Sequence, residues 1–375
     1  MKICIVSGIF EPESGGPATY APQLAQKLTE AGHEVVVVTY SKKSTYPSDT
    51  AYSFKLVRVA RGNKLLNRLR FFLMARSFIR SSELVYMLDW FAAGLPASIA
   101  ARLAGKPYVV RVGGDYLWEQ KYLESGKTPI ALGEFYYAGF YRHYPILFRI
   151  IRWVLRGAAH VVFNSEMQRD IYKKHYALAN VSTINNPIPE TAAMGIVRGV
   201  PTKEFVFWGR FIVMKNVITL VRAFGQAHIP GFTLALIGNG PQKKHIEDLV
   251  TEMGLGSRVR IEAALPQKAV LERVKNARAF ILPSWTDISP NQVYESMALG
   301  LPALVTKENY LSIRDQLPET IDPGSVSDIA AKLQVLADEA KYAQFVNEFS
   351  SVAFAWSWDD VLREHIALFK KVTNV

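Results

Sequence analysis

Short apolar runs rich in Val, Ile and Leu alternate with segments of helical periodicity along almost the whole chain. Parallel strands are joined through long crossovers, usually helices, so this alternation predicts parallel sheets covered by helices on both faces. The strands expected in the first half are Lys2–Ser7, Val35–Thr39, Leu84–Met87, Pro107–Val112, His160–Asn164 and Val181–Asn185. Those expected in the second half are Phe205–Trp208, Thr233–Ile237, Arg258–Glu262, Ala279–Leu282 and Ala303–Thr306.

The alternation is interrupted at residues 185–189, where Asn-Asn-Pro-Ile-Pro combines two prolines with turn-forming asparagines. A chain of 375 residues is also long for one domain, since most domains have about 100–200 residues. We therefore expect an α/β protein with two Rossmann-like, doubly wound domains, residues 1–190 and 191–356. The end of the chain is amphipathic, and we expect residues 357–375 to form a helix that packs back on the first domain.

Composition narrows the classes of protein that the chain can belong to. Cys4 is the only cysteine, which excludes an internal disulfide and a thiolate metal cluster. His175, His228 and His245 lack paired carboxylates at ligand spacing, so we expect no metal site and no cofactor. The sequence shows neither a run long enough to cross a membrane nor a signal peptide, which predicts a cytoplasmic protein.

In the second half, glycines and cations follow the expected strands. Ligands of open parallel sheets bind beyond the carboxyl ends of the strands. Gly209 and Arg210 follow one strand, with Lys215 a few residues later, and Gly238, Asn239 and Gly240 follow the next. Arginine can donate to two phosphate oxygens and lysine supplies a point charge, so the pair could neutralise a departing diphosphate. Taken singly, these residues also fit solvated surface cations and an ordinary tight turn.

The segment from Leu282 to Pro302 is more specific. A loop carrying Asp287 leads into a helix that we expect to start near Pro290 or Asn291, with Ser289 as its N-cap. The free amides of such a helix start bind phosphate groups. One turn further on, Glu295 could accept hydrogen bonds from ribose hydroxyls, and Asp287 could reach the sugar of a donor. The alternative is a capped helix with two solvated carboxylates.

In this order the motifs resemble the retaining GT-B glycosyltransferases of family four, over essentially the whole chain. The motifs that carry the resemblance are Gly15-Gly16, Gly32-His33-Glu34-Val35, Gly209-Arg210 with Lys215, Gly238-Asn239-Gly240-Pro241, Pro283-Ser284, Asp287 with Glu295, and Gly300-Leu301-Pro302. The resemblance implies two Rossmann-like domains facing a central cleft. It also implies transfer of a sugar from a nucleotide-diphosphate sugar to a glycan or lipid-linked acceptor, as in cell-surface polysaccharide synthesis.

The resemblance also implies a role for each matched residue. Gly15 and Gly16 would bring their amides to the donor phosphates, and Arg210 and Lys215 would bind the diphosphate without a metal. Glu295 would bind the ribose, while Asp287 would contact the donor sugar near the reacting carbon. The remaining donor-binding residues would be Gly209, Gly238, Asn239, Gly240, Ser289, Pro290 and Asn291.

The sequence departs from the family pattern at two positions. Asp287 stands where the family has glutamate, and a frequent strand-end histidine is replaced by glycine in the run Val109–Tyr116. Asp115 then becomes the candidate for orienting or deprotonating the acceptor, although it could equally cap a helix starting at Tyr116. These departures leave open a non-catalytic nucleotide-sugar-binding subunit. A hydrolysing nucleotide-sugar epimerase on the same scaffold is the other alternative, although the extra acid/base set that it would need is not found in the sequence.

Positive charge is concentrated in the first half. Residues 1–190 contain 24 Lys/Arg against 14 Asp/Glu, whereas the remaining residues contain 20 against 19. Two stretches, 62–80 and 135–156, mix arginines with leucines and aromatic residues. Such helices either bind an anionic membrane surface, at the inner face in this case, or form core helices with a basic rim. No nucleic-acid-binding module is recognisable, so we expect no nucleic-acid partner.

Overall fold

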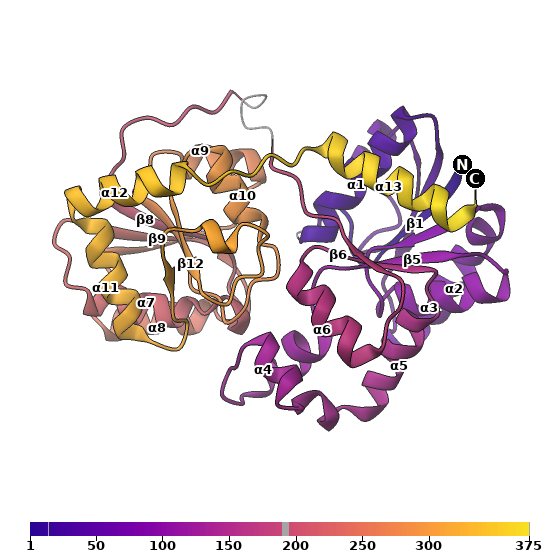
Figure 1. Ribbon diagram of the computed structural model, residues 1–375, viewed down its shortest axis with the longest axis horizontal. Coiled ribbons are helices and arrows are strands. Elements are labelled where there is room, and N and C mark those ends of the chain that lie inside the picture. Colours follow the sequence, from indigo (N-terminus) through magenta and orange to yellow (C-terminus); the bar gives the residue numbers. More distant parts are fainter. Residues whose placement is uncertain (14, 190–194, 375) are drawn as a thin grey trace. The chain divides into compact units, whose positions relative to one another are not determined.

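A computed structural model describes residues 1–13, 15–189 and 195–374 (Figure 1). The chain divides into two compact units. Unit 1 contains Met1–Leu117, Phe140–Asn185 and Trp358–Val375, and unit 2 contains Trp118–Gly139 and Asn186–Ser357. The chain therefore passes between the units four times, and a segment of the first half, Trp118–Gly139, packs with the second. The prediction placed all of residues 1–190 in the first domain, so this excursion of Trp118–Gly139 into unit 2 was not expected.

Unit 1 is built on a seven-stranded sheet in the order β3-β2-β1-β4-β5-β6-β7, and every strand pair is parallel. Its strands are β1 (Lys2–Ser7), β2 (Glu34–Ser41), β3 (Lys55–Ala60), β4 (Leu84–Met87), β5 (Tyr108–Val112), β6 (His160–Phe163) and β7 (Val181–Thr183). Its main helices are α1 (Gly16–Glu30), α2 (Lys64–Ser81), α3 (Gly94–Leu103), α5 (Pro145–Arg156), α6 (Glu166–Tyr176) and α13 (Trp358–Thr373).

Unit 2 is built on a six-stranded parallel sheet in the order β10-β9-β8-β11-β12-β13. Its strands are β8 (Glu204–Arg210), β9 (Thr233–Asn239), β10 (Val259–Glu262), β11 (Ala279–Leu282), β12 (Ala303–Thr306) and β13 (Thr320–Ile321). Its helices are α4 (Leu132–Tyr137), α7 (Val217–Gln226), α8 (Lys243–Glu252), α9 (Gln267–Val274), α10 (Asn291–Ala298), α11 (Val326–Ala337) and α12 (Glu339–Ser350).

The predicted fold class is confirmed, since both units are parallel sheets with covering helices. Strands that are buried on both faces, such as β4 and β11, have every residue buried and were read correctly from their apolar runs. The sequence analysis missed β3 and β13. Strand β3 lies at the sheet edge and exposes Lys55 and Ala60, so it has no continuous apolar run, and β13 has only two residues.

The first helix begins earlier than expected. Glu11–Tyr20 is rich in turn-forming residues, which predicts a loop there and a helix only from Ala21, but α1 starts at Gly16 with Pro17 in its first turn. Proline suits this position because the first amides of a helix have no intrahelical partner. Gly15 is the N-cap, with φ of 147°, and a β carbon there would come within 2.6 Å of Ile9. Gly15 is therefore required by the backbone itself.

Helix α13 packs on unit 1 through a buried histidine. Tyr86 donates a hydrogen bond to His365 Nε2 (2.7 Å), and His365 Nδ1 lies 2.7 Å from the carbonyl oxygen of Val361. Tyr20 stacks at an angle on Trp358, at the start of the same helix. Burial, and to a smaller extent the charge of Arg111, lowers the pKa of His365 from 6.5 to about 3. The imidazole is therefore neutral in the folded protein at ordinary pH.

This histidine should make the protein sensitive to acid. The folded protein keeps His365 neutral down to about pH 3, whereas the unfolded chain binds a proton near pH 6.5. The free energy of unfolding should therefore be constant above pH 6.5 with respect to this group. It should fall by about 1.4 kcal/mol for each pH unit below that value. Urea unfolding between pH 7 and 4 measures this slope.

In the variant His365→Gln, the free energy of unfolding should fall less steeply below pH 6.5, by about 1.4 kcal/mol per pH unit. His143→Gln changes an exposed histidine and serves as the matched control. Burial also lowers the pKa values of His33, His160 and His175, but these residues are present in all three proteins and cancel in the comparison. An unchanged slope in His365→Gln would contradict the assignment.

Candidate functional site

The candidate residues of unit 2 lie at one edge of its sheet. Strands β8, β9 and β11 are parallel, so Arg210, Asn239 and the loop after Leu282 all follow carboxyl ends on the same side. Arg210 is exposed, and among the described residues its guanidinium has no hydrogen bond or ion pair recorded. It is thus a cation available to a ligand. The amide of Gly240 donates to its neighbour's side chain, Asn239 Oδ1.

The glycines of this edge have a packing role that the sequence analysis did not foresee. We expected Gly209 and Gly238 in turns, but both lie in strands and face one another in the β8–β9 ladder. A β carbon on Gly238 would come within 1.9 Å of the Gly209 carbonyl oxygen, and one on Gly240 within 2.3 Å of the Phe211 carbonyl oxygen. The turn begins only at Gly240. Close backbone packing therefore requires glycine here whether or not a ligand binds.

Lys215 and Asp287 form a buried ion pair. The ammonium group of Lys215 donates to both carboxylate oxygens of Asp287, at 2.8 and 3.0 Å. Both side chains are almost fully buried. The sequence analysis expected one residue at the diphosphate and the other at the sugar, without a contact between them. An ammonium group has three protons, so one donor of Lys215 remains for a ligand.

The backbone of Asp287 is held by the turn that follows β12. The amide of Asp287 donates to the Glu308 carbonyl oxygen (3.0 Å), and its own carbonyl oxygen accepts from the Tyr310 amide (2.7 Å). These bonds form an isolated parallel bridge with Asn309. Burial of the Glu308 side chain raises its pKa. Asp287 is thus fixed through both its main chain and its side chain.

Glu295 lies in α10 and is bound by two side chains that the sequence analysis missed. Trp208 Nε1 donates to one carboxylate oxygen (2.9 Å) and Gln267 Nε2 to the other (2.8 Å). Burial raises the pKa of Glu295, and these two hydrogen bonds offset part of that shift. Each carboxylate oxygen can accept a further hydrogen bond, so ribose hydroxyls could still bind. In the sequence, the feature that could have indicated this contact is Trp208 at the end of an expected strand.

Helix α10 starts at Asn291, within the predicted range, but its N-cap differs from the prediction by one residue. Pro290 is the N-cap, Asn291 the first helical residue, and Ser289 does not cap the helix. Proline has a non-helical ψ of 116° here and no amide to donate. Asn291 accepts a hydrogen bond from Asn186 (2.9 Å) through its side chain. The first amides of α10 follow the Asp287 loop directly, as the anion-site hypothesis requires.

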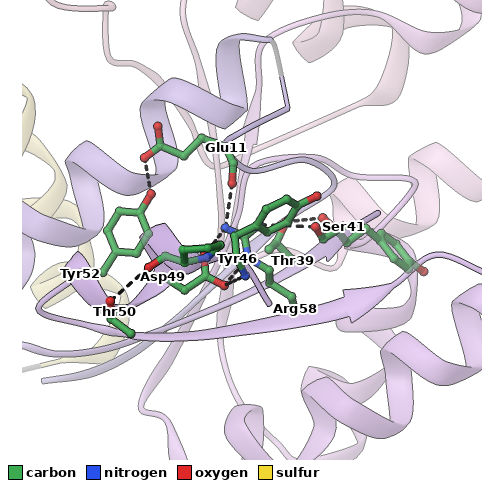
Figure 2. Close-up of polar contacts among 10 residues, drawn as sticks. Glu11, Thr39, Ser41, Tyr46, Asp49, Thr50, Tyr52 and Arg58 are labelled. Carbon is green, nitrogen blue, oxygen red and sulfur yellow. Dashed lines mark hydrogen bonds and ion pairs between the residues drawn. The ribbon is translucent and has the colours of Figure 1, made fainter. Parts of the chain in front are cut away.

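In unit 1, a network centred on Arg58 holds the loop that leads to Gly15 and Gly16 (Figure 2). Arg58 donates to both carboxylate oxygens of Asp49 (2.7 and 2.9 Å) and to the Glu11 carbonyl oxygen (2.7 Å). Tyr52 donates to the Glu11 carboxylate. Burial favours a higher pKa for Asp49, but Arg58 outweighs it and the net shift is downward.

A second arginine from the end of β3 holds the same loop. Arg61 donates to the Glu13 carboxylate (2.7 Å) and to the Gly8 carbonyl oxygen (2.9 Å). The two arginines thus fix the approach to the N-terminus of α1. The sequence analysis did not find them because β3 itself was missed.

Asp115 is buried in unit 1 and accepts a hydrogen bond from the Tyr172 hydroxyl (2.7 Å). It directly precedes a helical turn that includes Leu117–Tyr122, a place that suits the capping alternative. Gly15, Gly16 and Asp115 belong to unit 1, whereas the other candidate residues belong to unit 2. Within the described ranges, no group of three or more His, Cys, Asp or Glu side chains is placed to hold a metal ion.

Models of two families match the chain. Residues 14–191 match Glycosyltransferase Family 4, and residues 198–349 match Glycosyl transferases group 1. The chain belongs to the GT-B glycosyltransferases of family four. The Lipopolysaccharide 1,6-galactosyltransferase of Salmonella typhimurium is 24% identical over 198 residues, which cover 49% of this chain and 54% of that protein.

Two solved structures illustrate the fold of this glycosyltransferase. Sucrose-phosphate synthase from Thermosynechococcus elongatus has a TM-score of 0.76 at 17% identity, with 99% of each chain covered. Anabaena HepE in complex with UDP-glucose has a TM-score of 0.74 at 13% identity, covering 98% of this chain and 99% of that one. Several curated relatives are matched over only 21% to 54% of their own length.

The buried Lys215–Asp287 pair predicts strong coupling between the two residues. Either Lys215→Met or Asp287→Asn leaves the partner's charge buried without compensation, which should cost about 3–5 kcal/mol of unfolding free energy. The double variant Lys215→Met/Asp287→Asn should be more stable than the sum of the single changes predicts, because no unpaired charge remains. Chemical denaturation of the four proteins measures the coupling.

The exposed pair Lys244–Asp248 provides the control cycle, in which coupling should be much weaker. Additive single and double changes at positions 215 and 287 would contradict the ion pair.

Proposed function

We propose that this glycosyltransferase moves a sugar from a nucleoside-diphosphate sugar to a hydroxyl group of a glycan or lipid-linked glycan, with retention of configuration. The observation that carries this proposal is the arrangement at one edge of unit 2. An exposed arginine, a buried lysine–carboxylate pair and a helix start followed by Glu295 all lie there. These groups match the three parts of such a donor: diphosphate, sugar and ribose.

Each group has one task in this proposal. Arg210 binds the diphosphate, together with the first amides of α10 and the remaining proton of Lys215. Glu295, fixed by Trp208 and Gln267, accepts from the ribose hydroxyls. Asp287 accepts from a hydroxyl of the donor sugar. Because these cations carry the phosphate charge, the proposal requires no metal, and turnover should be insensitive to EDTA.

The proposed chemical step breaks the bond between sugar carbon C1 and the phosphate oxygen. The acceptor oxygen forms its bond to C1 on the same face, and its proton passes to the leaving phosphate oxygen. The products are the glycosylated acceptor and a nucleoside diphosphate. Arg210 contributes most when negative charge builds on the leaving phosphate, and so it acts mainly in the transition state. No protein base is needed for this route, which agrees with the burial of Asp115.

Product analysis separates this proposal from its alternatives. The protein is incubated with UDP-glucose, UDP-galactose, UDP-N-acetylglucosamine and GDP-mannose, with and without glycan acceptors, and released nucleoside diphosphate is measured. The proposal predicts release coupled to a glycosylated product of unchanged anomeric configuration. Release with only free or epimerised sugar would support the hydrolysing epimerase. Tight binding without release would support a binding subunit.

Substitutions at Arg210 and Glu295 should have different kinetic effects. Arg210→Ala should lower kcat by about 10²–10³-fold and weaken donor binding less than Glu295→Ala does, because its charge acts mainly on the leaving group in the transition state. Glu295→Ala should instead raise the donor dissociation constant by about 10–100-fold, since a charged hydrogen-bonding group is lost. Steady-state kinetics and calorimetric titration with nucleoside diphosphate distinguish these effects.

Arg222→Ala is the matched control, because Arg222 is exposed on α7 and away from the strand ends. Unchanged turnover in Arg210→Ala would rule out the leaving-group role.

We also propose that unit 1 binds an anionic membrane surface. Helix α2 exposes Leu66, Leu69, Leu73 and Met74, and its neighbour α3 exposes Leu103 at 76%. Exposed arginines lie among these residues, including Arg68, Arg70 and Arg76. An apolar strip with interspersed cations is the pattern of helices that lie on charged bilayers. Among the described helices, none is both long and apolar enough to cross a membrane.

Vesicle binding tests this surface. Sedimentation with phosphatidylglycerol-rich vesicles should recover the protein, and neutral phosphatidylcholine vesicles should recover much less. Leu69→Ser/Leu73→Ser should weaken binding by about tenfold, because two apolar side chains no longer enter the lipid. Met253→Ser/Leu265→Ser changes two exposed apolar residues of unit 2 and should leave binding unchanged. Equal loss in both double variants would contradict the assignment to α2.

A further inference from the structure

Helix α4 lacks a cap of its own. The first amides of any helix have no partner within the helix and need acceptors from elsewhere. Serine, threonine, aspartate or asparagine usually provides one from the N-cap position. In α4 the N-cap is Ala131, whose side chain cannot accept a hydrogen bond. The acceptors for α4 must therefore come from another part of the chain.

Two residues next to Asp287, one in the chain and one in space, contact the start of α4, and one of them supplies an acceptor. Leu132, the first residue of α4, donates its amide hydrogen to Thr286 Oγ1 at 2.9 Å in a buried contact. The next residue, Gly133, lies beside the phenol oxygen of Tyr310. A β carbon on Gly133 would stand only 3.3 Å from that oxygen. Thr286 and Tyr310 belong to unit 2, as α4 itself does.

The contacts of Thr286 and Tyr310 connect α4 to the loop that carries Asp287. Thr286 immediately precedes Asp287 and uses its own proton on the Trp285 carbonyl oxygen (2.8 Å), so its hydroxyl both donates and accepts. The amide of Tyr310 donates to the Asp287 carbonyl oxygen at 2.7 Å. Thr286, which precedes Asp287, and Tyr310, which is bonded to its carbonyl oxygen, are thus both in contact with α4.

The rest of the segment is firmly packed and also reaches Lys215. Phe135 and Tyr136 are buried, and Trp118 Nε1 closes the segment on itself by donating to the Ile130 carbonyl oxygen (2.9 Å). The turn Leu123–Ser125 contacts the turn Val213–Lys215. The excursion Trp118–Gly139 therefore touches the loops that carry both members of the ion pair.

We propose that Trp118–Gly139 is a wall of the donor-sugar site, and that Thr286 and Tyr310 are positioning residues that hold Asp287 against it. This inference rests on the proposed function for the role of Asp287, although the contacts themselves do not. The group around Glu295 comes from β8, α9 and α10 and does not use these contacts. Loosening the wall should therefore disturb sugar positioning and leave nucleotide binding intact.

Matched variants of Thr286 isolate the hydrogen bond. Thr286→Val keeps the shape but removes the acceptor for Leu132, whereas Thr286→Ser keeps the acceptor. Tyr310→Phe removes the hydroxyl group that lies beside Gly133, and Gly133→Ala presses on the same hydroxyl from the α4 side. Each change is small enough to test the contact rather than the fold.

Limited proteolysis measures how firmly Trp118–Gly139 is held, and it does not depend on enzymatic activity. Lys127 is exposed within the segment and offers a trypsin site. Cleavage there should be at least fivefold faster in Thr286→Val and Tyr310→Phe than in the wild type, and close to wild type in Thr286→Ser. Equal cleavage in Thr286→Val and Thr286→Ser would overturn the proposal, whatever the protein's activity.

Kinetics with the active nucleotide sugar provide the second measurement. Thr286→Val should lower kcat tenfold or more and reduce discrimination between UDP-glucose and UDP-galactose, with the dissociation constant of the nucleoside diphosphate within twofold of wild type. Thr286→Ser should restore kcat to within threefold. Loss of nucleotide binding in parallel with kcat would overturn the positioning role. If no donor is turned over by the wild type, the proposed function fails, and the proteolysis result still decides whether the wall exists.

Discussion

The buried ion pair between Lys215 and Asp287 is the interaction on which the candidate site of unit 2 depends. Removing two charges from water is costly, so such a pair persists only when its geometry is good and further hydrogen bonds support the two groups. Here Lys215 donates to both carboxylate oxygens, and the bridge to Asn309 fixes the main chain of Asp287. The pair has no net charge, whereas Arg210 is an exposed cation at this edge that a ligand can reach.

Around this pair, three distant parts of the sequence meet. The turn after β8 brings Lys215, the loop after β11 brings Asp287, and the segment Trp118–Gly139 packs on both through Thr286 and Leu123–Ser125. The site is therefore rigid where the donor sugar is proposed to bind. Glu295 is fixed separately by Trp208 and Gln267, so the proposed ribose end and the proposed sugar end have independent supports. This division allows affinity and turnover to be changed separately.

The sequence predicted the fold well because a parallel sheet leaves a strong local signal. Strands buried on both faces, such as Leu84–Met87 and Ala279–Leu282, are continuous apolar runs that helices separate. The edge strand Lys55–Ala60 lacks that run, and with it the sequence analysis lost Arg58 and Arg61. The glycine motifs were located correctly, but their role was partly misread. Gly209 and Gly238 allow two strands to approach closely, and no local sequence pattern reveals this.

The contacts that organise the site could not be read from the sequence, since each joins residues far apart in the chain. Nothing near residue 132 indicates that its amide needs Thr286, and the Lys215–Asp287 contact spans 72 positions. The most direct test is a crystal structure with a bound nucleoside-diphosphate sugar. The account predicts the diphosphate at Arg210 and the start of α10, ribose hydroxyls on Glu295, and a sugar hydroxyl on an Asp287 that is still paired with Lys215. A sugar bound away from Asp287, or a Lys215 that leaves Asp287 for the phosphates, would contradict it.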